Sequence, residues 1–174
     1  CLGVFAAAVL LLATPADARR VKRGGAKNPV RQAACVAECD TVRNLIYMIG
    51  DGMGLAHVTM LQIAEGYDNP VSFMRAENVA LIKSYSRNNR VTDSAAAGTA
   101  LATGHKTNNS MLGVLPDSTA VESMMAKAVR RGMATGLVVT CYLPHATPGA
   151  FYAHQVYRRT LEPIAEQLVE SGVD

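Results

Sequence analysis

Residues 44–54 of the chain read NLIYMIGDGMG, and this stretch decides the fold class. Leu45 to Ile49 form a continuous apolar run that ends at a glycine, a pattern typical of a strand buried inside a parallel sheet. The glycine-rich turn that follows leads into residues 55–65, where the sequence predicts a helix. A strand, a turn and a helix in this order predict an α/β fold, whose reactive groups gather where the strands end.

The same alternation of strands and helices continues along the rest of the chain. We expect further strands over residues 79–86 and 134–141, and helices over residues 94–102, 119–131 and 161–170. Pro148 is suited to start one more helix, and residues 171–174 look like the lead-in to another strand. Because strands that alternate with helices pair in parallel, the sequence predicts a sheet with helices on both faces.

Composition and charge fit a single globular domain. Apolar residues make up 49% of the 174 residues and charged residues 18%, so the chain is not of the disordered type. The net charge of +3 arises locally, because residues 19–31 hold six basic side chains and no acidic one. The remainder is close to neutral, and we expect no nucleic-acid partner for the domain. A basic arm that binds nucleic acid or membrane is an alternative for residues 19–31 alone.

The first 18 residues have the features of a secretory signal peptide that lacks its own start. Residues 2–13 are an uncharged apolar run, and Ala16-Asp17-Ala18 suits signal peptidase. The run is shorter than the ~20 residues that span a membrane, so no stable membrane insertion is expected. Basic residues directly after such a run oppose export, which leaves an uncleaved anchor as the alternative.

Three segments follow from this pattern, together with an expected location. We expect a signal peptide over residues 1–18, a basic linker over residues 19–40 and a domain over residues 41–174. The protein would be periplasmic or secreted. In such a compartment Cys35 and Cys39 would form a local disulfide or stay as two thiols.

Three loops carry residue types suited to chemistry. Asp51 follows the first strand between glycines, which permit close backbone approach. Ser94 starts a helix of small residues, whose free N–H groups suit a phosphate. His145 and Thr147 lie two residues apart in the third loop, with Arg158 thirteen residues after His145. Taken singly, Asp51 is equally well explained as a helix N-cap, and Asp-Ser before a helix is an ordinary cap.

Together these loops resemble the alkaline phosphatase family. Residues 47–54 match its first metal-binding strand and loop, residues 91–99 its nucleophile signature and residues 100–108 the segment after it. Residues 145–158 match the third motif, in which His-Ala-Thr-Pro is followed by Ala-His and an arginine. The resemblance implies the N-terminal part of a three-layer α/β/α sandwich with a mainly parallel sheet, incomplete in this chain.

The resemblance also implies a role for each site residue. Ser94 would be the nucleophile, forming a phosphoserine and coordinating zinc as an alkoxide. Asp51 would bridge one zinc and the magnesium, and Thr147 would bind the magnesium through its hydroxyl. Arg158 would hold two phosphate oxygens through its guanidinium fork, with Asp93 orienting it.

The implied cofactors are two zinc ions and one magnesium ion. His145 stands where some family members have an aspartate, so it would bind metal through water or not at all. His57, His105 and His154 are expected to be structural. Family members are much longer and carry their remaining metal ligands downstream of residue 174, so the chain alone is expected to be an inactive fragment. The substrates would be small phosphate monoesters, and the full-length form would be a homodimer.

Two alternatives come from other functional classes. A non-catalytic remnant could sequester phosphate or metal without turnover. A sister phosphodiesterase or sulfatase of the same superfamily would use a threonine or a modified residue as its nucleophile, and Ser94 within an alanine-glycine run disfavours both.

Overall fold

The computed structural model describes residues 10–11 and 44–174. The predicted signal peptide, the basic linker and the Cys35–Cys39 alternatives concern the remaining residues and stay predictions. Within the described ranges, no helix is both long enough and apolar enough to cross a membrane.

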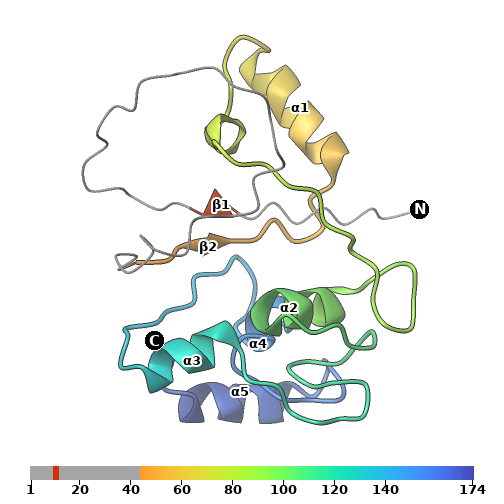
Figure 1. The fold of residues 1–174 in the computed structure, drawn as a ribbon, viewed down its shortest axis with the longest axis vertical. Coiled ribbons are helices and arrows are strands. Elements are labelled where there is room, and N and C mark those ends of the chain that lie inside the picture. Colours follow the sequence, from red (N-terminus) through yellow and green to blue (C-terminus); the bar gives the residue numbers. More distant parts are fainter. Residues whose placement is uncertain (1–9, 12–43) are drawn as a thin grey trace, which may run out of the picture.

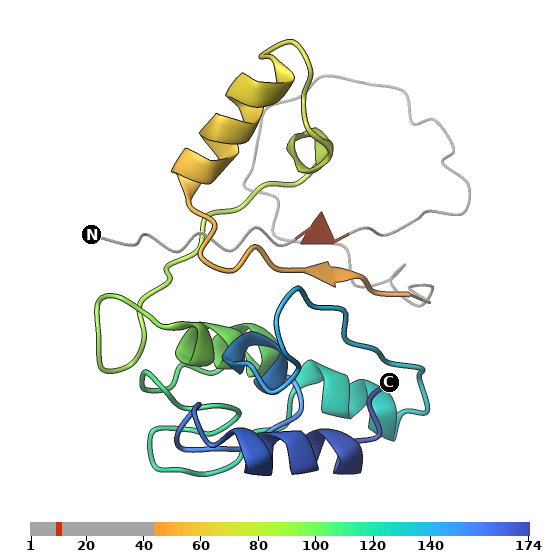
Figure 2. The same ribbon diagram turned by 180° about the vertical axis from the view of Figure 1, so that it is seen from behind.

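Helices lie on both sides of a short strand pair. β1 (Leu10–Leu11) pairs antiparallel with β2 (Tyr47–Met48), with Leu10 opposite Met48. In both views, α1 (Leu55–Glu65) and the 3-10 helix η2 (Ser72–Arg75) lie on one side of β2 (Figures 1 and 2). The other side holds α2 (Ser94–Thr103), α3 (Met124–Arg130), α4 (Ala146–Gly149) and α5 (Leu161–Glu170).

The predicted helices are found, with two displaced starts. Helices α1 and α5 have the predicted bounds, and α2 extends one residue further, to Thr103. The helix expected from Thr119 begins at Met124 instead, because the backbone of residues 119–121 pairs with residues 113–115. Ser123 caps this helix by accepting a hydrogen bond from the N–H of Ala126. Helix α4 starts at Ala146, two residues before Pro148.

The predicted strands are largely absent from the described part of the chain. The first is reduced to β2, and residues 79–86 and 134–141 form no strand. Their apolar side chains lack a covering layer, since Leu81 and Val138 are 98% and 101% exposed. An isolated strand is unstable in water, because its hydrogen bonds and side-chain contacts come from neighbours. The strands expected over residues 79–86 and 134–141 are therefore not formed in the described part of the chain, and the parallel sheet stays a prediction.

The core joins α2 to α4 and places their N-terminal ends side by side. Its buried residues are mostly small: Ala95, Leu112, Ala146, Ala150, Tyr152, Ala153 and Ile164. A Cβ atom at Gly98 would lie 3.0 Å from the Cβ of Ala150, so the absence of a side chain permits this close approach. The packing fixes Ser94 of α2 relative to Thr147 of α4.

Candidate active site

Asp93 is the N-cap of α2 and is held on both carboxylate oxygens. Its Oδ1 accepts the N–H of Ala96 at 2.9 Å, and its Oδ2 accepts the N–H of Ser110 at 2.9 Å. The N–H of Asp93 donates to Oδ1 of Asn109 at 3.2 Å. These contacts fix the start of α2, and Ser94 is its first residue.

Asp51, Ser94 and Thr147 come together from three separate loops. The Ser94 hydroxyl donates to Oδ1 of Asp51 at 3.1 Å, and the Thr147 hydroxyl donates to Oδ2 at 2.6 Å. Asp51 thus lies between the two hydroxyl groups. The glycines around it leave its carboxylate exposed to solvent, and Thr147 and Ser94 are partly exposed. Side chains 43 and 96 residues apart in sequence share one small cluster of oxygen atoms.

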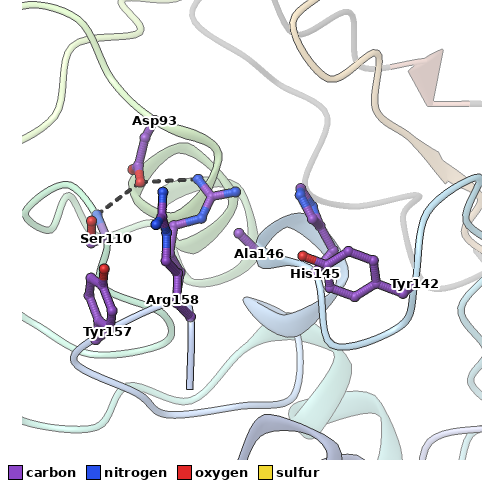
Figure 3. A pocket seen from close by; sticks show the side chains of 8 residues that line it. Asp93, Ser110, Tyr142, His145, Ala146, Tyr157 and Arg158 are labelled. Carbon is purple, nitrogen blue, oxygen red and sulfur yellow. Dashed lines mark hydrogen bonds and ion pairs between the residues drawn. The ribbon is translucent and has the colours of Figure 1, made fainter. Parts of the chain in front are cut away.

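Arg158 lies against Asp93. Its Nη1 is 3.2 Å from Oδ2 of Asp93, and both side chains are only about a quarter exposed, at 22% and 24%. The backbone N–H of Arg158 donates to the carbonyl of Ser110 at 2.8 Å, which holds the chain beside the same loop. Figure 3 shows the guanidinium directed toward Asp93. One nitrogen is paired there, and the rest of the guanidinium can meet an anion.

A pocket of about 420 Å³ opens beside this ion pair. Its lining residues are Asp93, Ser110, Tyr142, His145, Ala146, Tyr157, Arg158 and Arg159. In Figure 3, His145 and Tyr142 lie on one side of Arg158, and Ser110 and Tyr157 on the other. Asp51, Ser94 and Thr147 are not among the lining residues, so the oxygen cluster and the pocket are adjacent through Asp93–Ser94 and Ala146–Thr147.

His145 caps α4 by position and packs edge-on against Tyr142, with ring centroids 5.1 Å apart. Its Nδ1 atom is buried and has no hydrogen-bond partner among the described residues. A buried imidazole nitrogen normally finds a partner, so this atom is a candidate for a contact with water or metal. The structure does not bring His145 into hydrogen-bond contact with Asp51.

The oxygen cluster fits one of the implied metals better than the other. Carboxylate and hydroxyl oxygens suit a hard cation such as Mg²⁺, which keeps several water ligands of its own. Zinc takes three or four donors drawn mainly from His, Cys, Asp and Glu. Among residues 44–174, no three such side chains come together. The described residues therefore fit part of a magnesium site and do not by themselves fit a zinc pair.

Two of the three other histidines have structural contacts, as expected. The His57 ring accepts the N–H of Gly54 at 3.2 Å and closes the start of α1. His154 Nδ1 lies 2.7 Å from the carbonyl of Gly113, and its backbone N–H donates to Gln167. His105 is exposed.

Sequence reasoning missed part of the pocket wall. Ser110 and Tyr142 line the pocket but lie outside the motifs quoted from the sequence, and Tyr157 lies within residues 145–158 but was given no role there. Arg159 lines it next to Arg158. These residues lie in irregular loops, where the sequence has no periodic pattern that predicts which side chains face the pocket. The pair Arg158-Arg159 does indicate local positive charge.

The described contacts gather a helix-end serine, a carboxylate and an arginine from distant loops. The sequence matches the family described as Alkaline phosphatase over residues 42–173. The chain therefore belongs to the alkaline phosphatase family.

Similar proteins of known name support this assignment. Alkaline phosphatase 4 of Bacillus subtilis is 37% identical over 139 residues, covering 76% of this chain and 30% of that protein. The human tissue-nonspecific isozyme of alkaline phosphatase is 35% identical over 136 residues, covering 68% of this chain and 26% of that protein. The chain thus spans about a third or less of the length of these relatives, and its matched part is consistent with the N-terminal portion.

Solved structures show the same fold. The alkaline phosphatase of the Antarctic bacterium TAB5 superposes with a TM-score of 0.66 at 40% identity, covering 71% of this chain and 36% of that chain. A mutant of the TAB5 enzyme with Mg bound in its M3 site gives a TM-score of 0.67 at 38% identity, covering 71% of this chain and 35% of that chain. The chain has the alkaline phosphatase-like fold over its matched part.

Proposed function

We propose that this chain supplies the nucleophile and the phosphate-binding arginine of a phosphate-monoester hydrolase. The observation that carries the proposal is the convergence of Asp51, Ser94 and Thr147, with Arg158 paired to the residue before Ser94. Family membership supports the reaction class. In the whole fold, a three-layer α/β/α sandwich with a mainly parallel sheet, β2 and the segments 79–86 and 134–141 would belong to the central sheet.

Ser94 is the proposed nucleophile. Its hydroxyl would release its proton to solvent and its oxygen would attack phosphorus, forming the Ser94–phosphate bond as the bond to the leaving alcohol breaks and that alcohol's oxygen takes a proton from solvent. Water would then attack the phosphoserine, releasing phosphate and restoring the Ser94 hydroxyl. The N-terminus of α2 offers free N–H groups and partial positive charge to the phosphoryl oxygens. Asp51 accepts the Ser94 hydroxyl hydrogen bond and so holds the oxygen in one direction.

Arg158 is the proposed phosphate-binding group. Asp93 holds one guanidinium nitrogen, which orients the planar fork and leaves its other donors for two phosphate oxygens. Such a clamp stabilises the charge that spreads over the equatorial oxygens in the transition state. Small phosphate monoesters would enter through the pocket beside Arg158.

The described residues support a magnesium ion better than they support a zinc pair. Asp51 and Thr147 would hold Mg²⁺, which when bound supplies positive charge beside Ser94, and His145 would reach it through water. Asp51 and Ser94 would contribute to the zinc pair, whose further ligands the described residues do not supply. We further propose a homodimer of the full-length form and a periplasmic or secreted location.

A phosphoenzyme trapping experiment tests the nucleophile in the full-length enzyme. Labelled phosphate trapped at acidic pH and mapped by peptide analysis is expected on Ser94. Ser94→Ala should remove the label and most of the turnover, while metal content stays close to that of the unaltered enzyme. Thr103→Ala, at the other end of α2, is the control and should keep both. Label on another residue, or full activity in Ser94→Ala, would contradict the proposed mechanism.

A non-catalytic remnant that sequesters phosphate or metal is the second candidate for the polypeptide as it stands. The observation that no three His, Cys, Asp or Glu side chains come together among residues 44–174 favours it. Titration of the purified chain with Mg²⁺ and with phosphate distinguishes the two. Tight binding without turnover, even after the remaining fold is supplied, would favour the remnant.

A further inference from the structure

The pocket beside Arg158 has room for more than a phosphate group. Its volume of about 420 Å³ lies within the range of pockets that hold whole small molecules. Figure 3 shows Arg158 between His145 on one side and Ser110 with Tyr157 on the other. Because Arg158 is the proposed phosphate-binding group, the wall formed by Ser110 and Tyr157 is placed to contact the alcohol part of a phosphate monoester.

The charges on the pocket wall do not cancel. Asp93 is paired with Arg158 at 3.2 Å, whereas Arg159 is exposed and forms no ion pair within residues 44–174. Both arginines and Asp93 line the pocket, so the wall has one carboxylate and two guanidinium groups. The surplus positive charge lies on Arg159, and a phosphate held by Arg158 leaves that charge without a partner.

The wall also offers hydrogen-bond donors that the described part of the chain does not use. The hydroxyl groups of Ser110, Tyr142 and Tyr157 line the pocket and have no hydrogen-bond partner among residues 44–174. The carboxylate of Asp93 cannot serve them further, since both of its oxygens already accept hydrogen bonds. A wall with spare donors and a spare positive charge suits a ligand group that is an anionic acceptor.

Ser110 has a strained backbone at the centre of this wall. Its φ is +75°, in the left-handed region that a residue with a side chain enters at a cost. In this conformation its N–H donates to Asp93 at 2.9 Å and its carbonyl accepts the N–H of Arg158 at 2.8 Å. Glycine would make both backbone contacts without strain, and what serine adds is a hydroxyl on the pocket wall. Strain retained beside a binding group is typical of a functional position.

We propose that Ser110, Tyr157 and Arg159 form a subsite for a carboxylate in the alcohol part of the substrate. The phosphate group lies against Arg158, the two hydroxyl groups donate to the carboxylate, and the guanidinium of Arg159 supplies the opposite charge. A carboxylate carries a single negative charge and so matches the single surplus charge of the wall, whereas a second phosphate would bring about two. The subsite rests on the proposed function for the position of the phosphate group and adds to it a class of substrate, the phosphate monoesters of hydroxy acids.

Two phosphonates of equal length test the subsite in the full 174-residue chain. Neither can be hydrolysed, and 3-phosphonopropionate carries a carboxylate where propylphosphonate carries a methyl group. Chemical-shift titrations at pH 8, in buffer freed of metal ions by a chelating resin, give the two dissociation constants, whose ratio is the carboxylate preference. We expect 3-phosphonopropionate to bind roughly threefold to fivefold tighter. Added salt should reduce this preference, because it screens an exposed ion pair.

Arg159→Ala should abolish the carboxylate preference and leave the binding of propylphosphonate unchanged. Arg159→Lys should retain part of the preference, since it keeps the charge and loses the planar fork. Arg131→Ala is the matched control. Arg131 is also an exposed arginine that follows an ion-paired one, Arg130 with Glu122, but it lies outside the pocket. This variant should keep the full preference.

Ser110→Gly separates binding from stability. It should reduce the carboxylate preference by roughly twofold or more, because one donor to the anion is lost. Thermal unfolding should show a variant at least as stable as the unaltered chain, since relief of left-handed strain offsets the greater freedom of an unfolded glycine. Ser118→Gly is its control: Ser118 has φ +70° and is exposed outside the pocket, so the same exchange should leave ligand binding unchanged.

The outcomes separate this subsite from the proposed function. Equal binding of the two phosphonates, or a preference that survives in Arg159→Ala, would overturn the subsite while the proposed phosphate site stands. A preference lost equally in Arg131→Ala would also overturn it, because charge anywhere on the surface would then suffice. Arg158→Ala should weaken both ligands alike. Failure of both ligands to bind the unaltered chain would count against the proposed phosphate site and against the subsite that rests on it.

Discussion

Asp93 connects three separate parts of the site. Its two oxygens receive the N–H groups of Ala96 and Ser110 and the guanidinium of Arg158. One carboxylate thus joins the start of α2, a loop and the arginine. An asparagine at this position could keep the hydrogen bond from the N–H of Ala96. Its NH₂ group, however, would replace the oxygen that accepts from Ser110 and Arg158, so these two donors would lose their acceptor.

We therefore expect Asp93→Asn to lower the free energy of unfolding by about 1–3 kcal/mol, because charge-assisted hydrogen bonds lose their acceptor. Chemical denaturation of the chain measures this. Glu122→Gln is the control, since it removes an exposed ion pair with Arg130 and should cost less than about 1 kcal/mol. Equal losses in the two variants would show that Asp93 does not hold the loop and the arginine together.

Tyr152 gives the chain a pH dependence at alkaline pH. Burial raises the pKa of Tyr152 to about 12, and its hydroxyl donates to the carbonyl of Leu143 at 2.8 Å. The unfolded chain has a tyrosine pKa of about 10, so it releases this proton first. The stabilising contribution is complete below pH 10 and is lost as the pH rises toward 12.

Tyr152→Phe should reduce the loss of stability between pH 10 and 12 relative to the unaltered chain. At pH 8 the same variant should be less stable by about 1 kcal/mol, because it lacks the hydrogen bond to Leu143. Thermal unfolding across this pH range measures both effects. Parallel pH profiles for the two proteins would contradict the assignment to Tyr152.

At the scale of elements, a tight contact joins α2 to the segment before Arg158. Gly113 has φ +58°, its N–H donates to the Thr99 hydroxyl oxygen at 3.0 Å, and an added Cβ would lie 2.1 Å from the carbonyl oxygen of Ala153. Leu112 and Gln155 pair on either side of this contact. No side chain fits there without a shift of the backbone.

Gly113→Ala should cost about 3 kcal/mol or more in unfolding free energy, because it combines left-handed strain with a backbone clash. Gly104→Ala is a matched control, since Gly104 has φ +80° and its Cβ would meet nothing within 4 Å. Strain alone should cost it about 1–2 kcal/mol. Thermal denaturation compares the two, and a Gly113→Ala variant no less stable than Gly104→Ala would disprove the clash.

The elements also show where sequence reasoning succeeds. Ser94 was predicted to start a helix because a capping Asp precedes an alanine run, and such signals are local. The predicted strands at residues 79–86 and 134–141 failed for the opposite reason. Their apolar side chains are suited to burial in a sheet, but no layer among the described residues covers them. Helix α1 likewise has no buried residue. The resemblance implied only that Asp51 and Thr147 share the magnesium, and no local pattern in the sequence predicts the hydrogen bond between them.

For the whole molecule, we expect residues 19–174 alone to have no phosphatase activity. Asp51, Ser94 and Thr147 cannot hold a metal pair without further ligands. The measurement is hydrolysis of p-nitrophenyl phosphate by the purified polypeptide with added zinc and magnesium, compared with a sample containing chelator. Turnover that the chelator abolishes would refute this expectation.

The sequence separations within the site imply an order of assembly. Asp93 meets Ser110 across 17 residues, Arg158 across 65, and Asp51 meets Thr147 across 96. Closing the longest of these loops costs about 1.5 kcal/mol more entropy than closing the shortest. Loop entropy therefore favours the contact of Asp93 with Ser110 first, the contact of Asp51 with Ser94 across 43 residues next, and the contact of Arg158 with Asp93 after it. During synthesis from the N-terminus, the arginine finds its partner already oriented.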